Sequence, residues 1–387
     1  MSVSAAKKSE MQPPGTPSQR GAVRSLTSAL LSRLVIGSPF SSAWIAVAAL
    51  LLIDLVAAPN SLSSNAFSSI LPLTAVLAIA SMGQLLVIMN AGIDLSAPMV
   101  ITMAGTLLIG LSRGNNTQTG SAVVLTLFLA MIVGFVNGLL VVIARINSLV
   151  ATLAVGGIVL GLVTGYRNSI QGIQEAAAVP SDLASLAARR IGGVSVLLLF
   201  AVALTFTASI AIRYTVIGRR FQVVGGNPRA AWVSGIGVRR YQIGAYTAAG
   251  ALYGIAGLAL GSFVQTPTLD IGNPYLLGPI AVVVIAGTSL RGGTGSVVST
   301  FIAAFFLTQL SQTLIIMGLS SAWQYIVFGM AIALGLLISG DRILSLVGRR
   351  VIGVHGSLVW QDPQYSVIEE AANYGVQSED EDGDDME

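Results

Sequence analysis

Long apolar stretches alternate with short polar segments along most of the chain. A helix that crosses a bilayer needs roughly 20 apolar residues at about 1.5 Å of rise each. Ten stretches approach this length: Phe40–Ala58, Phe67–Met89, Ala97–Leu111, Ala122–Ala144, Leu149–Tyr166, Val194–Ile212, Tyr241–Val264, Leu276–Leu290, Val297–Met317 and Ala322–Ser339. The third and eighth span only about 15 residues, so we expect broken or re-entrant helices there. The pattern predicts an all-α, polytopic integral membrane protein with about eight to ten transmembrane helices.

The same pattern divides the chain into three regions. Residues 1–37 are polar and contain prolines, which predicts a disordered basic N-terminal tail. Residues 38–345 hold the apolar stretches and form the transmembrane domain, within which residues 213–240 are the most basic loop. Residues 346–387 form an acidic tail that is expected to be disordered and solvated. This tail either only solubilises the chain or regulates a partner by folding back on basic loops.

The basic residues indicate the orientation in the membrane. If the N-terminus is cytoplasmic, 16 of the 20 lysines and arginines fall on the cytoplasmic side. Cytoplasmic loops of membrane proteins carry an excess of lysine and arginine. The sequence therefore predicts a bacterial cytoplasmic (inner) membrane protein with both termini in the cytoplasm.

Composition excludes several classes of function. Only 10% of the residues are charged, whereas soluble domains carry about 25%. With no cysteine and a single histidine, His355, thiolate chemistry and a histidine metal cluster are excluded. A P-loop needs a lysine after its glycines, but the only lysines are Lys7 and Lys8 in the N-terminal tail. We expect no catalytic, cofactor or metal site in this chain, so any ATP-driven work must come from a partner chain.

The segment NAGIDLSAP, residues 90–98, predicts a break between two helices. Gly92 can adopt a positive φ and interrupt the helix, and Ser96 is a suitable N-cap for the next one. Pro98 is tolerated in the first turn of that helix. Asp94 would be costly in lipid, so it must lie in protein, at a water-filled cavity or at the interface. Asp94 either lines a solute path or only caps the new helix.

A weak internal repeat relates this break to a second one. The string GQLLVIMNAGIDLS from Gly83 can be laid on GPIAVVVIAGTSLR from Gly278 with one constant offset. In both strings an apolar run ends in a glycine-led polar break, and another helix follows. Paired broken helices at corresponding positions indicate a transport pathway. Matches between two apolar strings can also arise by chance.

The basic loop contains the pattern of a very short helix, NPRAAWVSG. Asn227 is suited to the N-cap, Pro228 to the first helical position and Gly235 to the C-terminal cap. The predicted helix is half apolar and flanked by arginines. It either docks into a groove of a partner or lies on the lipid surface.

Uncharged polar residues occur within the apolar stretches. They are Gln84, Asn90, Asn137, Thr152, Gln309, Ser311 and Gln312. Such side chains are costly in lipid and should face protein or a water path. They either line the path of a neutral, polyhydroxylated solute or hold helices together. The only acidic residues in the stretches or the break are Asp54 and Asp94, which argues against a proton-coupled carrier.

Four strings together resemble the permease subunits of bacterial ABC importers for monosaccharides of the ribose, xylose and galactose type. They are GQLLVIMNAGIDLS, VNGLLVVIARINSLVATLAVGGIVLGL, GRRFQVVGGNPRAAWVSGI and AVVVIAGTSLRGGTGSV, and the resemblance covers about Phe67 to Gly340. The chain departs from the usual pattern in both tails and in the residues that follow GIDLS. The GYAGQLSLG-like string favoured by branched-chain amino-acid permeases is absent.

The resemblance implies a permease that pairs with a second permease subunit, as a homodimer or heterodimer. A periplasmic or lipid-anchored solute-binding protein would deliver a sugar or sugar-like solute, and a cytoplasmic ABC ATPase would bind the ATP. We expect the substrate path to include Gln84, Asn90, Asp94, Ser96, Asn137, Gln309 and Gln312. The ATPase-coupling residues are expected to be Arg219, Arg220, Asn227, Pro228, Arg229, Ala230, Ala231 and Gly235.

Two other classes of function compete with this interpretation. A stand-alone secondary carrier or facilitator for a small polar solute would need coupling acids in its spans or a self-contained pore. The shortage of membrane carboxylates and the short capped helix both speak against it. A membrane-embedded enzyme would need a set of metal ligands, a nucleophile–base pair or a cofactor motif, and the sequence shows none of these.

Overall fold

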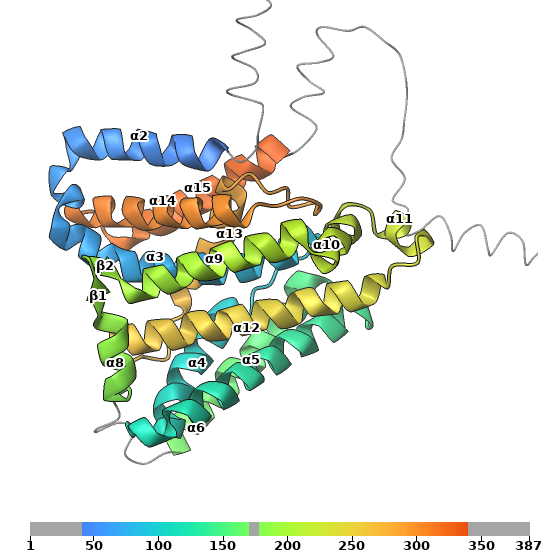
Figure 1. Cartoon of the computed structure of the whole chain (residues 1–387), viewed down its shortest axis with the longest axis horizontal. Coiled ribbons are helices and arrows are strands. Elements are labelled where there is room, and N and C mark those ends of the chain that lie inside the picture. The colour runs from blue at the N-terminus through green and yellow to red at the C-terminus, as the bar shows by residue number, and fades with distance from the viewer. Residues whose placement is uncertain (1–40, 170–177, 340–387) are drawn as a thin grey trace, which may run out of the picture. The chain divides into compact units, whose positions relative to one another are not determined.

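The computed structural model describes residues 41–169 and 178–339. Within them, each of the ten apolar stretches contains a helix, which confirms the predicted all-α class (Figure 1). These helices are α2 (Ser41–Ala57), α3 (Ser64–Met89), α4 (Ala97–Ser112), α5 (Thr119–Val142), α6 (Ser148–Ser169), α9 (Val196–Tyr214), α12 (Val238–Val264), α13 (Gly278–Ile285), α14 (Val297–Ile316) and α15 (Ser321–Ser339). The predicted N-terminal tail, residues 1–37, and acidic tail, residues 346–387, lie outside the described residues.

Short elements connect these helices. They are the 3-10 helices η1 (Pro59–Leu62), η2 (Asn116–Gln118) and η3 (Asn273–Tyr275), the helices α8 (Ser181–Ala188), α10 (Val216–Gly226) and α11 (Pro228–Val233), and the strands β1 (Arg190–Ile191) and β2 (Val194–Ser195). The two strands form an antiparallel hairpin in which Arg190 pairs with Ser195. Figure 1 shows α8 and the hairpin at one end of the long helices and α11 at the other.

Six helices in the described part of the chain are long and apolar enough to cross a membrane, namely α3, α5, α6, α9, α12 and α14. Helix α4 has 16 residues and α13 has only eight, so the predicted shortness of these two segments is confirmed. The total of eight to ten spans stays a prediction, because it depends on how the shorter helices sit in the bilayer.

The outer helices present large apolar side chains to their surroundings. Phe128 on α5, Leu162 on α6 and Phe206 on α9 are exposed in the single chain. Such a surface suits lipid or another membrane subunit, because hydrocarbon tails are as apolar as these side chains. The chain is therefore built as a multi-pass membrane protein.

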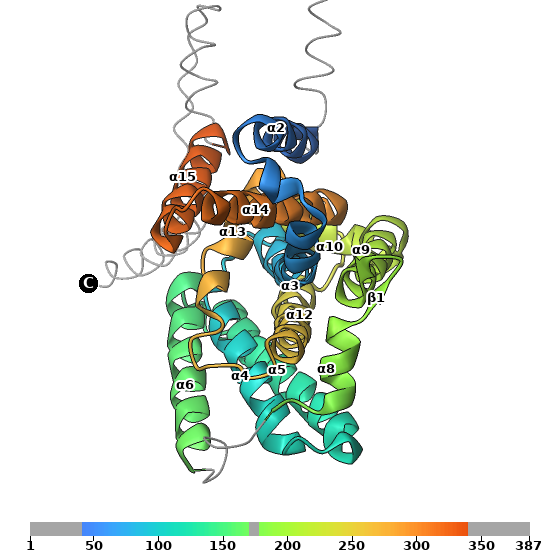
Figure 2. The same ribbon diagram turned by 90° about the vertical axis from the view of Figure 1, so that its left-hand side faces the viewer.

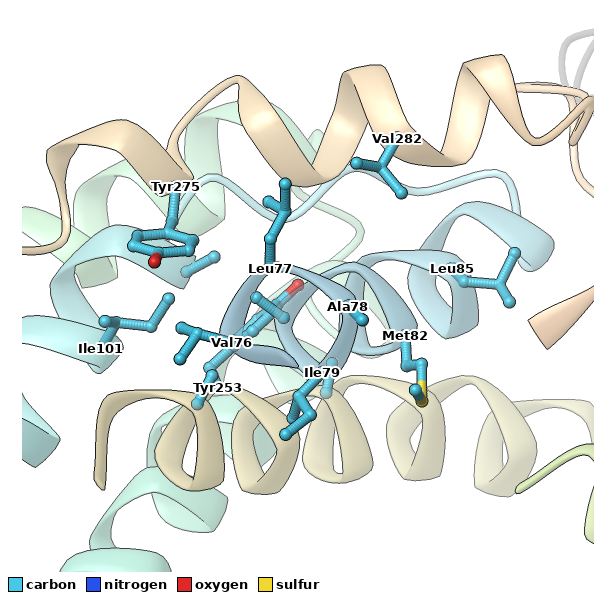
Figure 3. Close-up of a cluster of buried hydrophobic side chains, with 14 of the residues drawn as sticks. Val76, Leu77, Ala78, Ile79, Met82, Leu85, Ile101, Tyr253, Tyr275 and Val282 are labelled. Carbon is cyan, nitrogen blue, oxygen red and sulfur yellow. The ribbon is translucent and has the colours of Figure 1, made fainter. Parts of the chain in front are cut away.

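Helix α3 forms the centre of the core. It is buried along most of its length, and its side chains meet α12 on one side and α13 on another (Figure 3). Val76, Ile79 and Met82 of α3 lie in this cluster with Tyr253 of α12 and Val282 of α13. A central helix that is apolar on all sides is typical of a buried position in a bundle.

Glycines on α12 allow α4 and α5 to approach it closely. A Cβ atom at Gly250 would overlap the carbonyl oxygen of Ala130, and one at Gly254 would lie 2.7 Å from the Ala130 methyl group. On another face, a Cβ at Gly257 would lie 2.5 Å from the carbonyl oxygen of Ile101. Small residues at three- and four-residue spacing are the usual means by which membrane helices pack backbone to backbone.

Candidate functional site

The first break, residues 90–96, interrupts the chain between α3 and α4. Ala91 adopts the positive φ of 59°, so the sequence prediction for Gly92 was wrong at this point. Gly92 is constrained by space instead, because a Cβ there would overlap the hydroxyl oxygen of Tyr246. The N–H of Gly92 donates to the carbonyl of Val87 at 3.1 Å, which closes the last turn of α3.

Asp94 is enclosed by protein within this break. Its Oδ1 accepts hydrogen bonds from the backbone N–H of Ser96 at 2.9 Å and from the Ser96 hydroxyl at 2.6 Å. The Nδ2 of Asn137, on α5, donates to the same hydroxyl oxygen at 2.8 Å. Ser96 is the N-cap residue of α4, but its side chain makes no capping hydrogen bond, which corrects the predicted role. Its hydroxyl instead links the break to α5.

Gln84 connects the break to α12. Its side-chain amide lies 2.9 Å from the hydroxyl of Tyr253. In the amide orientation that satisfies every neighbour, its nitrogen donates to the carbonyl of Asp94 at 3.0 Å. Its oxygen then accepts from the Asp94 N–H at 3.3 Å. Gln84 therefore gives both the N–H and the carbonyl oxygen of Asp94 a hydrogen-bond partner, as buried backbone groups require.

Helix α6 satisfies two further backbone groups of the break. The Ser148 hydroxyl accepts from the N–H of Ile93 at 3.3 Å, and the Thr152 hydroxyl accepts from the N–H of Leu95 at 2.9 Å. The extended backbone of the break is thus held by side chains of α3, α5 and α6. Non-helical backbone at membrane depth is tolerated where protein satisfies it in this way.

Several buried oxygens around the break have no hydrogen-bond partner among the described residues. They are Asn90 Oδ1, Asp94 Oδ2, Asn137 Oδ1 and the Tyr246 hydroxyl. Buried polar atoms normally have a partner from protein or ordered water. These oxygens can therefore form hydrogen bonds with water, or with other protein groups in another conformational state.

Gln309 lies in a separate network between α2 and α14. Its Nε2 donates to Asp54 Oδ2 at 2.6 Å, and the Thr313 hydroxyl donates to Asp54 Oδ1 at 2.8 Å. Both Asp54 and Gln309 are fully buried. The network joins the first described helix to α14, and the structure does not bring Gln309 together with the polar residues of the first break.

Gln312 lines a mainly apolar cavity of about 280 Å³. Its polar lining residues are Thr308, Ser311, Gln312 and Gln324. Tyr275 and Phe328 add aromatic surface, and aliphatic residues of α3, α12, α14 and residues 265–277 form the rest of the wall. The lining contains no charged side chain. The cavity lies along the N-terminal half of α3 and the C-terminal half of α14, away from the end at which α11 lies.

An irregular segment, residues 265–277, forms part of this cavity and was not recognised in the sequence. After α12 the chain turns back along α4, where the Thr102 hydroxyl accepts from the N–H of Gly272 at 3.2 Å. A Cβ at Gly272 would overlap the carbonyl oxygen of Pro98. Arg167 donates to the carbonyl of Pro267 at 2.8 Å. Figure 2 shows this segment between α12 and α13. The proline- and glycine-containing string TPTLDIGNP was the available signal.

The second break, residues 286–296, separates α13 from α14. Its glycines have positive φ values of 83° at Gly287, 88° at Gly292 and 102° at Gly293. Ser296 caps α14 by accepting from the N–H of Ser299 at 3.2 Å. The predicted interruption of both repeat strings is confirmed. The segments before the two breaks differ, because α3 has 26 residues and α13 only eight.

The predicted short helix in the basic loop is α11. Asn227 Oδ1 accepts from the N–H of Ala230 at 2.9 Å, and Pro228 begins the helix. Gly235 follows with a φ of 76°, as expected of a C-terminal glycine. Trp232 and Val233 are 72% and 75% exposed. The apolar side chains at the end of this helix are therefore exposed. We call them the apolar tip of α11.

The other predicted coupling residues lie on α10 and α11. Arg219, Arg220, Arg229 and Ala230 are exposed, whereas Ala231 is buried. The sequence prediction missed α10, which precedes α11 and buries Phe221, Val224 and Gly225 on one face. The three- to four-residue spacing of these residues was the signal for an amphipathic helix.

Comparisons with known proteins agree with these features. A family model described as "Branched-chain amino acid transport system / permease component" matches residues 66–336. The probable ABC transporter permease protein y4mJ of Sinorhizobium fredii is 34% identical over 284 residues, which cover 72% of this chain and 83% of that protein. The autoinducer 2 import system permease protein LsrC of Enterobacter is 30% identical over 308 residues, covering 80% and 88%.

The ribose import permease protein RbsC of Escherichia coli K12 is 31% identical over 311 residues, which cover 78% of this chain and 96% of that protein. No solved structure matches the chain. The family model covers both breaks, α11 and the cavity at Gln312, and together with these relatives it confirms the resemblance seen in the sequence. The chain therefore belongs to this family of ABC-importer permeases, as a multi-pass membrane subunit of a transport system.

Proposed function

We propose that the chain forms the translocation path for a neutral sugar or sugar-like solute in a bacterial ABC importer. Two permease subunits, identical or different, enclose the path in the cytoplasmic membrane, with N- and C-termini in the cytoplasm. A periplasmic or lipid-anchored binding protein delivers the solute, and a separate ATPase binds and hydrolyses ATP. The chain itself contributes the path and the contact with the ATPase.

The single observation that carries this proposal is the exposed short helix α11. A six-residue helix held by Asn227 and Pro228 presents Trp232 and Val233 outward, with Arg229 beside them. An apolar helix tip in a basic loop fits a groove on a partner protein. The basic surroundings support a cytoplasmic location for this end of the chain, on the side where an ATPase would be found. Docking of α11 on the ATPase is therefore how ATP binding reaches the membrane helices.

The lining of the cavity at Gln312 contains no charged side chain, which supports a neutral cargo. With the termini in the cytoplasm, the cavity lies in the outer half of the bundle, on the side from which a binding protein would deliver its solute. Gln312, Gln324 and Ser311 offer donors and acceptors for hydroxyl groups, and Tyr275 offers an aromatic surface. Named relatives in the comparison import ribose and autoinducer 2.

The first break serves the inner half of the same path. Its buried carboxylate and amides are held by α3, α5 and α6, and several of their oxygens have spare hydrogen-bonding capacity. We assign Gln84, Asn90, Asp94, Ser96 and Asn137 to this polar region. When α11 moves, the break changes its contacts and the path opens toward one side of the membrane.

Charge reversal on α11 tests the coupling role. Arg229→Glu should leave the amount of membrane-inserted chain unchanged and reduce ATPase recovery, uptake and solute-stimulated ATP hydrolysis. Arg189→Glu is the matched control, because Arg189 is an exposed arginine at the hairpin end of the bundle. The readouts are uptake into proteoliposomes and ATPase activity of the complex. Normal transport by the Arg229 variant would overturn the assignment. Solute flux through the purified chain alone would instead support a stand-alone carrier.

A further inference from the structure

Three stretches of backbone that are far apart in the sequence meet at one point. They are the end of α3 at Met89–Ala91, the end of α10 at Gly225–Gly226 and the second break at Gly292–Gly293. We call these seven residues the backbone junction. It brings both breaks into contact with the helix that leads into α11.

A hydrogen bond joins the two breaks directly. The N–H of Gly293 donates to the carbonyl oxygen of Met89 at 2.9 Å. A Cβ at Gly292 would lie 3.0 Å from that same oxygen and 3.0 Å from the nitrogen of Ala91. The second break is thus seated against the turn in which the first one begins.

Gly225 places α10 against both breaks. A Cβ at Gly225 would overlap the carbonyl oxygen of Met89 and lie 3.3 Å from the carbonyl oxygen of Gly293. Gly225 is buried, and a Cβ at Gly292 would in turn lie 2.9 Å from its carbonyl oxygen. No side chain of ordinary size fits between these three backbones.

Gly226, the next residue, differs sharply in its surroundings. A Cβ there would meet only the Cα of Gly293, at 4.0 Å, which is ordinary van der Waals contact. Asn227 follows as the cap of α11, so no linker separates α11 from the backbone junction. The other end of α10 is held against α9, where Gln222 Nε2 donates to the carbonyl oxygen of Ile212 at 3.3 Å. Helix α10 is therefore a short element held at one end and in contact with both breaks at the other.

We propose that Gly225, Gly292 and Gly293 are positioning residues through which α11 displaces both breaks together. Close-packed backbone transmits displacement with little loss, because protein interiors are dense and poorly compressible. A push on α11 moves the end of α10, and α10 contacts Met89 and the second break at once. The inference rests on the proposed function, since it presumes that α11 receives the push from an ATPase. It adds the place at which the movement of α11 is transmitted to the membrane helices.

A reporter at the second break tests the proposal without knowledge of the solute. The chain has no native cysteine, so Thr294→Cys supplies a single labelling site at an exposed residue. The complex is purified from its native membrane with its ATPase. The rate of maleimide labelling is then measured without nucleotide and with ATP plus vanadate. In the reporter background we expect a several-fold nucleotide-dependent change in that rate.

Gly225→Ala and Gly226→Ala are then compared in the reporter background. We expect Gly225→Ala to assemble with the ATPase and to keep basal hydrolysis, but to lose the nucleotide-dependent change in labelling. Gly226→Ala should retain it. Gly292→Ala, which adds a Cβ from the opposite side of the junction, should behave like Gly225→Ala.

Three results would overturn the inference. The first is an unchanged nucleotide response in Gly225→Ala and Gly292→Ala. The second is a failure of both variants to assemble while Gly226→Ala assembles, because the contact would then serve packing alone. The third is an ATPase-bound reporter complex that shows no nucleotide-dependent labelling. Absence of any ATPase from the purified complex would instead refute the proposed function.

Discussion

Two glutamines on α14 provide a matched pair, because they are three residues apart and face different surroundings. Gln309 is fully buried and donates to Asp54, whereas Gln312 lines the cavity beside Tyr275. Gln309→Leu removes the 2.6 Å hydrogen bond to a buried carboxylate and leaves Asp54 with the Thr313 hydroxyl at 2.8 Å. A hydrogen bond to a charged group contributes about 1.5–3 kcal/mol. We expect this variant to lose about that much stability.

Gln312→Leu should have the opposite profile. Its side chain faces a cavity, so the free energy of unfolding should change by less than about 0.5 kcal/mol. Loss of one neutral hydrogen bond to the solute costs about 0.5–1.5 kcal/mol, which corresponds to a loss of transport of about two- to tenfold.

Both variants are measured by thermal unfolding in detergent and by uptake into proteoliposomes, at equal amounts of inserted protein. We expect Gln309→Leu to lower stability and to retain transport per folded complex. A stable Gln309→Leu that does not transport would show that Gln309 lines the path and that its network with Asp54 is incidental. Identical behaviour of the two variants would refute the distinction between network and cavity.

Two further predictions concern packing and the first break. Gly250→Val should prevent α12 from approaching α5 and sharply reduce the amount of folded protein recovered from membranes. Gly244→Val should be tolerated, because Gly244 lies on the same helix but no atom lies within 4 Å of its Cβ position. Recovery after detergent extraction measures both, and equal recovery would contradict the packing argument. Ser96→Ala removes the link between Asp94 and Asn137 and should lower stability by about 1.5–3 kcal/mol. Ser185→Ala, which removes an exposed hydrogen bond within α8, should change it by less than about 0.5 kcal/mol. Thermal unfolding of both variants measures this, and an unchanged stability of Ser96→Ala would contradict the role of the cluster.

The sequence predicts the features that are decided locally. The ten apolar stretches form helices because each is long and apolar in its own right. The ends of helix α11 are determined by three nearby residues, Asn227, Pro228 and Gly235. Each of them favours the backbone conformation that its position at a helix end requires. Both breaks follow from polar, glycine-led strings in apolar surroundings. In each case the information lies within a few residues of the feature.

Contacts between distant residues could not be predicted in this way. Asp54 and Gln309 are 255 positions apart, and the sequence contains no signal that pairs them. Ser96 has the residue type of an N-cap, but its hydroxyl donates a hydrogen bond to the nearby carboxylate of Asp94 instead. Gly92 was expected to supply the positive φ, but Ala91 adopts it, and Gly92 is required instead because the hydroxyl of Tyr246 leaves no room there for a Cβ. Tertiary packing decided each of these three outcomes.

The tagged chain should be purified from its native membrane in mild detergent, and the proteins that accompany it should be identified by mass spectrometry. We expect an ATPase in stoichiometric amount, a second permease subunit and a secreted solute-binding protein whose ligand is a sugar or sugar-like molecule. The Arg229→Glu variant should lose the ATPase and keep the second permease subunit. Recovery of the chain without any ATPase, at every salt and nucleotide concentration tried, would contradict the central claim.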